Sequence, residues 1–186
     1  VYWMNRRQAR QVYNWPLRMK QRTENFIRLQ ERQLTWLFII GVNNSGTTLL
    51  QELLARHDAV ATLPGEGQRL SRALPRPGPM NLSRIWSEKL ESFRKSSNTD
   101  DSLSACRLKW DWLCYYSVDN KCRYLMEKSP PNICRANNID KVFGNSKYIC
   151  LIRNPYAQIQ SNIRRYNTDL EAAAKKYISY LKFQKN

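Results

Sequence analysis

The segment Phe38–Leu50, which reads FIIGVNNSGTTLL, is the most informative part of this sequence. It belongs to an apolar run that begins at residue 35, and such runs are typical of strands buried on both faces of a parallel sheet. A short polar loop follows, and the leucine spacing over residues 47–56 predicts a helix. This arrangement brings backbone N–H groups and the positive end of the helix dipole to one point. The segment therefore predicts an anion site, with phosphate as its usual occupant.

The two glycines of this loop have the spacing of a Walker A phosphate loop. Four residues separate Gly41 from Gly46, as in the first part of that motif. The lysine that should follow is replaced by Thr47, so a nucleoside triphosphate would lose its main cation at the β- and γ-phosphates. We therefore expect a smaller phosphate- or sulfate-bearing group here. A P-loop kinase stays as a less favoured alternative, because the strand ending at Arg153 also carries no acidic residue for magnesium.

Strands and helices alternate along the rest of the chain. A second buried strand is predicted over residues 147–153, with Cys150 as a small buried thiol, and shorter strands over 59–63 and 123–127. Helices are predicted over residues 20–33, 47–56, 82–94, 103–117, 133–143, 155–166 and 168–184. This alternation predicts an α/β protein, a P-loop-like three-layer domain in which helices flank a central parallel sheet.

The charge of the chain points to an anionic partner. Its 186 residues include 31 Lys and Arg against 15 Asp and Glu, for a formal net charge of +16. The hydrophobic fraction of 42% is too high for a disordered polyelectrolyte. A phosphorylated cofactor, an acidic substrate, a membrane surface or a nucleic acid would each suit this charge. No nucleic acid is expected, because no recognised nucleic-acid-binding module is present.

Two segments carry a family resemblance. The loop from Asn43 to Thr48 resembles the cofactor loop of sulfotransferases that use 3′-phosphoadenosine 5′-phosphosulfate (PAPS), in which a Ser-Gly-Thr-Thr core follows a strand. Residues 147–155 resemble the family's element for the 3′-phosphate of PAPS, a strand that ends in an arginine, here Arg153, with a serine eight residues later, here Ser161. The cofactor-binding residues that the resemblance implies are Asn43, Asn44, Ser45, Gly46, Thr47, Thr48, Arg153 and Ser161.

Two further positions resemble the family's catalytic residues. Residues 125–132 are similar to the Glu-Lys-Thr-Pro segment of Golgi-type and bacterial members, which implies that Lys128 lies near the transferring sulfuryl group. Glu66 resembles the position that supplies the general base in tyrosylprotein sulfotransferases. The only histidine, His57, is a weaker candidate base at the end of the first predicted helix. The resemblance extends over roughly residues 36–183, and no metal is expected.

The resemblance implies transfer of a sulfuryl group from PAPS to a hydroxyl of a glycan or a protein tyrosine. The acceptor is expected to be an anionic glycan or an acidic tyrosine peptide. The main departure is Asn44, because most family loops carry an arginine or lysine there. This loss leaves open an alternative, a non-catalytic descendant of the fold that binds polyanions.

The same resemblance sets expectations for domains and location. Residues 1–34 are expected to be a basic helical extension, and 35–186 a sulfotransferase domain that lacks its carboxyl-terminal part. A membrane anchor is expected only outside this chain, because no run reaches the roughly 18 apolar residues of a span. The expected location is the Golgi lumen or membrane in a eukaryote, and the cytoplasm in a bacterium.

Overall fold

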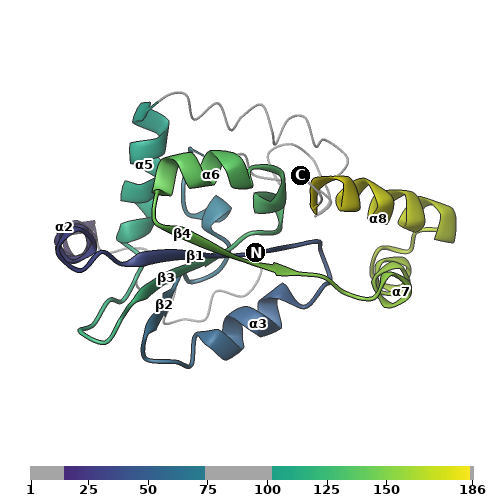
Figure 1. The fold of residues 1–186 in the computed structure, drawn as a ribbon, viewed down its shortest axis with the longest axis horizontal. Coiled ribbons are helices and arrows are strands. Elements are labelled where there is room, and N and C mark those ends of the chain that lie inside the picture. Colours follow the sequence, from purple (N-terminus) through teal and green to yellow (C-terminus); the bar gives the residue numbers. More distant parts are fainter. Residues whose placement is uncertain (1–14, 74–101, 185–186) are drawn as a thin grey trace.

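The computed structural model describes residues 15–73 and 102–184 (Figure 1). Within them, four parallel strands form one sheet in the order β2-β3-β1-β4. The strands are β1 Thr35–Gly41, β2 Val60–Thr62, β3 Tyr124–Lys128 and β4 Ser146–Leu151. The helices are α2 Trp15–Arg32, α3 Thr47–Leu54, α5 Ser102–Leu113, α6 Ala136–Phe143, α7 Pro155–Tyr166 and α8 Leu170–Gln184, with short 3-10 helices η1 Gly67–Arg69 and η4 Pro130–Cys134.

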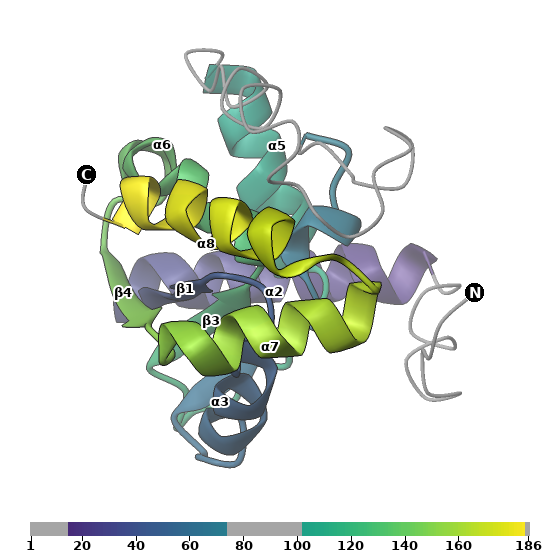
Figure 2. The ribbon, with the colours of Figure 1, turned by 90° about the vertical axis from the view of Figure 1, so that its right-hand side faces the viewer.

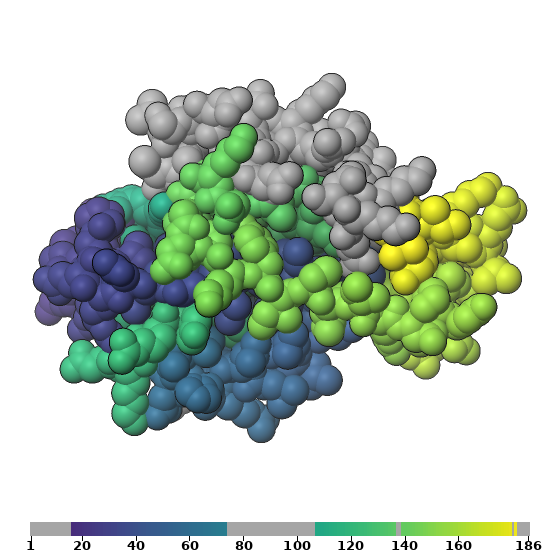
Figure 3. All heavy atoms as spheres, viewed as in Figure 1, coloured from purple at the N-terminus to yellow at the C-terminus, as the bar shows by residue number. Residues whose placement is uncertain are grey.

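Helices cover both faces of the sheet, which confirms the predicted three-layer α/β architecture. Helices α5 and α6 lie over one face and α3 over the other, while α2 lies at the amino-terminal end of β1 (Figure 1). Helices α7 and α8 pack together beyond the carboxyl end of β4 (Figure 2), and in the space-filling view they form one continuous lobe (Figure 3). None of the described helices combines the length and the apolar character needed to cross a bilayer.

An aromatic cluster fills the core between the sheet and α5 and α6. Trp36 and Phe38 lie two residues apart on β1, so their side chains share one face of the sheet. Both contact the ring of Phe143 on α6, with centroid distances of 4.6 and 5.3 Å. Trp112 on α5 stacks on the same ring at 5.1 Å. Phe143 therefore joins both helices to the central strand.

The last predicted strand lies at an edge of the sheet and not in its interior. We expected residues 147–153 to form a buried strand, but every position of β4 is partly buried or exposed, with Lys147 and Cys150 exposed. Cys150, predicted to be buried, is exposed. An apolar run signals a strand, but it cannot tell a central strand from an edge strand, and β4 pairs only with β1 among the described strands. Among the four cysteines whose burial the structure describes, Cys114 and Cys122 are the buried ones, and burial raises the pKa of both thiols.

Most predicted helices are present with shifted ends. The segment predicted as one helix over 133–143 is divided into η4 and α6, since Pro130 and Pro131 start a tight 3-10 turn before the α-helix. Gly144 ends α6 with a positive φ of 71°, as expected for a glycine at that position. The helix predicted over 82–94 lies outside the described residues.

Helix α2 is joined to the rest of the domain through its polar side chains. The Nδ2 atom of the buried Asn25 donates to the carbonyl oxygens of Leu113 (2.7 Å) and Tyr116 (2.9 Å). Farther along the helix, Arg32 donates to carbonyl oxygens within residues 119–122. Leu113 is the last residue of α5, and the other main-chain oxygens belong to the connection between α5 and β3. The helix therefore caps an irregular segment of the core.

The Asn25→Ala variant should lower the free energy of unfolding by about 1–3 kcal/mol, because the carbonyl oxygen of Leu113 loses its Asn25 donor and that of Tyr116 keeps only the amide of Gln21. Urea denaturation measures this change. The control is Lys20→Ala on the same helix, whose side chain is 75% exposed and forms only a 3.9 Å ion pair with Glu24. Equal midpoints for the two variants would show that α2 is not held by these contacts.

Candidate active site

The parallel sheet gathers four segments at one edge. Residue Ile39 of β1 pairs with Lys128, the last residue of β3, and Gly41 pairs with Leu151, the last residue of β4. The loops that follow β1 and β4 therefore emerge beside the Lys128 side chain. The segment after β2, which contains Glu66, leaves the same edge because β2 is parallel to β3. This is the edge at which open α/β sheets bind ligands.

The loop after β1 has the backbone geometry of an anion site. Gly46 caps α3 with φ 102° and Asn44 has φ 65°, so the chain turns sharply before the helix. The first N–H groups of α3 have no acceptor within the helix and point toward the loop. Ser45 is buried, and both its N–H and its hydroxyl donate to the carbonyl of Val42 (3.2 and 2.7 Å). Ser45 therefore stabilises the loop through its side chain.

Three of the predicted residues meet at the mouth of this loop. The Lys128 Nζ atom lies 3.3 Å from Thr48 Oγ1 on α3 and 3.6 Å from Glu66 Oε1. Lys128 is buried and Glu66 has 22% of its side chain exposed. Water therefore screens this ion pair less than a surface pair. The cluster combines a cation, a hydroxyl and a carboxylate beside a row of helix N–H groups.

The other predicted cation, Arg153, also contacts the loop. Its Nη1 atom donates to the carbonyl of Asn44 at 2.8 Å. The Asn44 side chain is occupied as well: Nδ2 donates to Oδ1 of Asn162 (2.6 Å), and Oδ1 accepts from Nη1 of Arg165 (3.0 Å). Helix α7 thus holds the loop at the position where relatives of the predicted family carry a cation, and it supplies a cation of its own from Arg165.

The sequence analysis did not identify Arg165 and Asn162 as residues that contact the loop, although their position on α7 near Ser161 pointed to them. Ser161 was predicted as a ligand on α7, and Arg165 follows it by four residues, which places both on one side of the helix. Ser161 is partly exposed. The same helix contacts the loop once more, because Gln158 Nε2 donates to the carbonyl of Asn43. The structure therefore brings α7 as a whole against the phosphate-type loop.

His57 lies away from this cluster. Helix α3 starts at the loop and must return to the opposite edge before the parallel strand β2 begins, so its carboxyl end is remote from Lys128. There the Nδ1 atom of His57 accepts the N–H of Ala59 at 3.0 Å. Across residues 15–73 and 102–184, no three His, Cys, Asp or Glu side chains are grouped as metal ligands would be.

The parallel α/β fold and the loop after β1 agree with a match to a known protein family. Residues 37–184 match the model of the sulfotransferase family, so the chain belongs to that family, and the resemblance over residues 36–183 is confirmed. It is 28% identical over 137 residues to Protein-tyrosine sulfotransferase 2 of Gallus gallus, covering 72% of this chain and 35% of that protein. Protein-tyrosine sulfotransferase 1 of Danio rerio is 26% identical over 140 residues, which are 74% of this chain and 38% of that protein. The chain spans little more than a third of the length of these relatives.

The Gly41→Ala variant should lower the free energy of unfolding by about 1–3 kcal/mol. A Cβ atom there would lie 2.8 Å from the carbonyl oxygen of Leu151 and 3.0 Å from Oγ of Ser45, and a main-chain oxygen in the sheet cannot move aside easily. Chemical denaturation gives the value. In a strand without such contacts, alanine is normally at least as stable as glycine, so an unchanged or raised stability would contradict the packing described here.

Proposed function

We propose that this chain carries the donor site and catalytic pair of a sulfotransferase that moves a sulfuryl group from PAPS to a hydroxyl on a protein tyrosine or a similar acceptor. The observation that carries the proposal is the cluster of Lys128, Glu66 and Thr48 at the anion loop. A phosphate-binding loop alone would suit many nucleotide-binding proteins. A buried lysine between that loop and a carboxylate adds the two groups that transfer to an alcohol requires.

The donor groups around the loop fit PAPS. The N–H groups at the start of α3 and the hydroxyls of Thr47 and Thr48 would hold the 5′-phosphosulfate. Arg153 and Ser161 would hold the 3′-phosphate, together with Arg165. Each guanidinium has five N–H donors, and only one contact of each to Asn44 is recorded among the described residues, so donors remain for a phosphate. When bound, PAPS supplies an activated sulfuryl group on a phosphate leaving group.

Glu66 and Lys128 take separate roles in this proposal. The Glu66 carboxylate accepts the proton of the acceptor hydroxyl as that oxygen becomes a nucleophile. The Lys128 ammonium donates to the oxygen on which negative charge develops, where a fixed cation stabilises the transition state most. The ammonium group also donates to Thr48 Oγ1 at 3.3 Å, which helps to fix its position. No step in this scheme is assigned to a metal ion.

Asn44 stands where a cation was expected in the loop, and Arg165 of α7 supplies a cation at this position instead. Arg165 reaches the Asn44 side chain from α7, so positive charge is supplied at the loop from outside it. This contact favours a catalytic site over a non-catalytic descendant that binds polyanions. The site charge is then delivered by tertiary packing and not by the loop sequence.

Features around Glu66 favour an acidic acceptor. Arg69, whose side chain is 63% exposed, pairs with Glu66 at 3.5 Å, and Arg72 is exposed in the same short segment. Two exposed cations in the segment of the proposed base suit acidic residues around the acceptor, and the names of the relatives as protein-tyrosine sulfotransferases support a tyrosine as that acceptor. For a eukaryotic source, we place this activity in the Golgi lumen.

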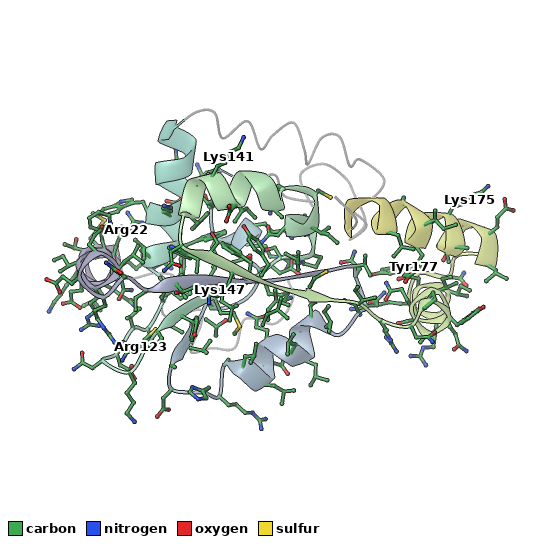
Figure 4. All side chains as sticks on the ribbon, viewed as in Figure 1. Arg22, Arg123, Lys141, Lys147, Lys175 and Tyr177 are labelled. Carbon is green, nitrogen blue, oxygen red and sulfur yellow. The ribbon has the colours of Figure 1, made fainter. Side chains whose placement is uncertain are left out.

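The Arg153→Ala variant should bind adenosine 3′,5′-bisphosphate about 10- to 100-fold more weakly than the parent chain, because a charge-assisted contact to the 3′-phosphate is lost. Isothermal calorimetry measures the dissociation constants. The control is Lys147→Ala, which removes an exposed cation from the amino-terminal part of β4, on the side of the sheet near α2 (Figure 4). If both variants weakened bisphosphate binding equally, the effect of Arg153 would come from net charge and not from a contact with the 3′-phosphate.

The full-length protein containing this chain should transfer labelled sulfate from PAPS to acidic tyrosine peptides. Glu66→Gln should lower kcat about 100-fold or more, since it removes the proton acceptor, and should leave binding of the bisphosphate nearly unchanged. Glu52→Gln on the exposed side of α3 is the matched control and should keep full turnover. Binding of the bisphosphate without transfer to any peptide or glycan would favour the non-catalytic alternative.

A further inference from the structure

A second carboxylate lies behind the proposed catalytic pair and has no role in the scheme above. Glu127 precedes Lys128 on β3, and its side chain is completely buried. Its Oε1 atom accepts the N–H of Gly67 at 2.8 Å and the hydroxyl of Ser129. Its Oε2 atom accepts Nδ2 of Asn132. Every contact is therefore a donor aimed at the carboxylate.

The contact with Gly67 fixes the residue that follows the proposed base. The Gly67 carbonyl accepts from Nε1 of Trp112 at 3.0 Å, so its N–H and its carbonyl are both held by buried side chains. A Cβ atom on Gly67 would lie 2.7 Å from the Trp112 ring and 2.8 Å from Glu127 Oε1. Only glycine fits between them, and the backbone beside Glu66 has little freedom to shift.

A second path leads from Glu127 to the carboxylate of Glu66 itself. Ser129 donates its hydroxyl to Glu127 and accepts the N–H of Gln68 at 3.3 Å. The Nε2 atom of Gln68 then donates to Glu66 Oε2 at 2.7 Å. The other Glu66 oxygen faces Lys128. Both oxygens of the proposed base are thus oriented, one by the lysine and one through this chain of contacts.

Burial opposes the ionised form of Glu127, and its neighbours favour that form. Burial raises the pKa of Glu127, while Ser129, Gly67 and the nearby cations Arg135 and Lys128 act in the opposite direction. Arg135 is also buried, and its Nε and Nη2 atoms donate to Asn132 Oδ1 at 2.9 and 2.7 Å. Such a buried polar network is seldom the most stable filling of a core, and its best-attested use is to specify one arrangement of the chain.

We propose that Glu127 is a positioning residue, which holds Gly67 and Gln68 so that the Glu66 carboxylate stays oriented against Lys128. The inference rests on the proposed function for the role of Glu66 as a base. The contacts of Glu127 are independent of that role. Because Glu127 and Lys128 are adjacent on one strand, the same two residues of β3 set both the cation and the orientation of the base.

The test uses a charge swap within the network. In Glu127→Gln, one amide oxygen still accepts from Gly67 and Ser129, but the amide nitrogen then faces Nδ2 of Asn132, donor against donor. A flip of the Asn132 amide would not relieve this mismatch, because its nitrogen would then face the N–H donors of Arg135. In the double variant Glu127→Gln with Asn132→Asp, a carboxylate replaces the second donor, and every contact is satisfied again.

Two measurements are made on all variants, with Asn132→Asp alone as the matched single change. In full-length protein, Glu127→Gln should lower kcat about 10- to 100-fold while the dissociation constant for adenosine 3′,5′-bisphosphate stays within about twofold, and the double variant should recover kcat. The mismatch with residue 132 should displace the side chain of residue 127 and weaken the bond that it accepts from Gly67. Amide hydrogen exchange at Gly67 should therefore be faster in both single variants and return to the parent rate in the double variant.

The outcomes separate the inference from the proposed function. Unchanged Gly67 exchange in Glu127→Gln overturns the inference. A kcat that falls only in parallel with bisphosphate binding, or that the double variant fails to recover, overturns it too, because the effect would then be general loss of structure. The parent chain could transfer no sulfate while Gly67 exchange is faster in the single variants and normal in the double variant. The proposed function would then fail, but the conclusion that Glu127 positions the Glu66 segment would stand.

Discussion

The contact of Lys128 with Thr48 and Glu66 is the interaction on which the proposed site depends. The three residues come from β3, α3 and the segment after β2, so the contact exists only when the parallel sheet is in register. A lysine ammonium at this depth needs partners, because an unpaired buried charge is costly. The proposed catalytic pair is therefore also the arrangement that makes burial of the lysine tolerable.

The basic side chains of the described residues fall into two groups with different surroundings. On α2, the guanidinium of Arg18 lies 4.8 Å from the Tyr115 ring centroid, and that of Arg22 lies 5.1 Å from the Trp110 ring. These arginines pack the helix on the domain and are not a free anionic-ligand surface. Arg153 and Arg165, by contrast, converge on the loop from the opposite end of the sheet. A count of basic residues cannot make this division, because it depends on what each side chain touches.

Local signals predicted much of the architecture. The apolar run before Gly41, the glycine-bracketed loop and the proline at the start of α7 each identified an element, because backbone sterics and burial act over a few residues. The placement of Cys150 was wrong for the same reason: position in the sheet depends on neighbours far along the chain. The roles of Glu66, Lys128, Arg153 and Ser161 stay predictions, although the structure brings the first two together.

The class of fold, the glycine-bracketed loop after β1 and the family could be predicted from the sequence, since these rest on short motifs whose backbone geometry is local. The contacts of α7 with Asn44, including that of Arg165, and the contact of Glu127 with Gly67, sixty residues away, could be learned only from the folded chain. Contacts between distant segments follow from strand order and register. Those are set by the packing of the whole core, which no single stretch of sequence contains.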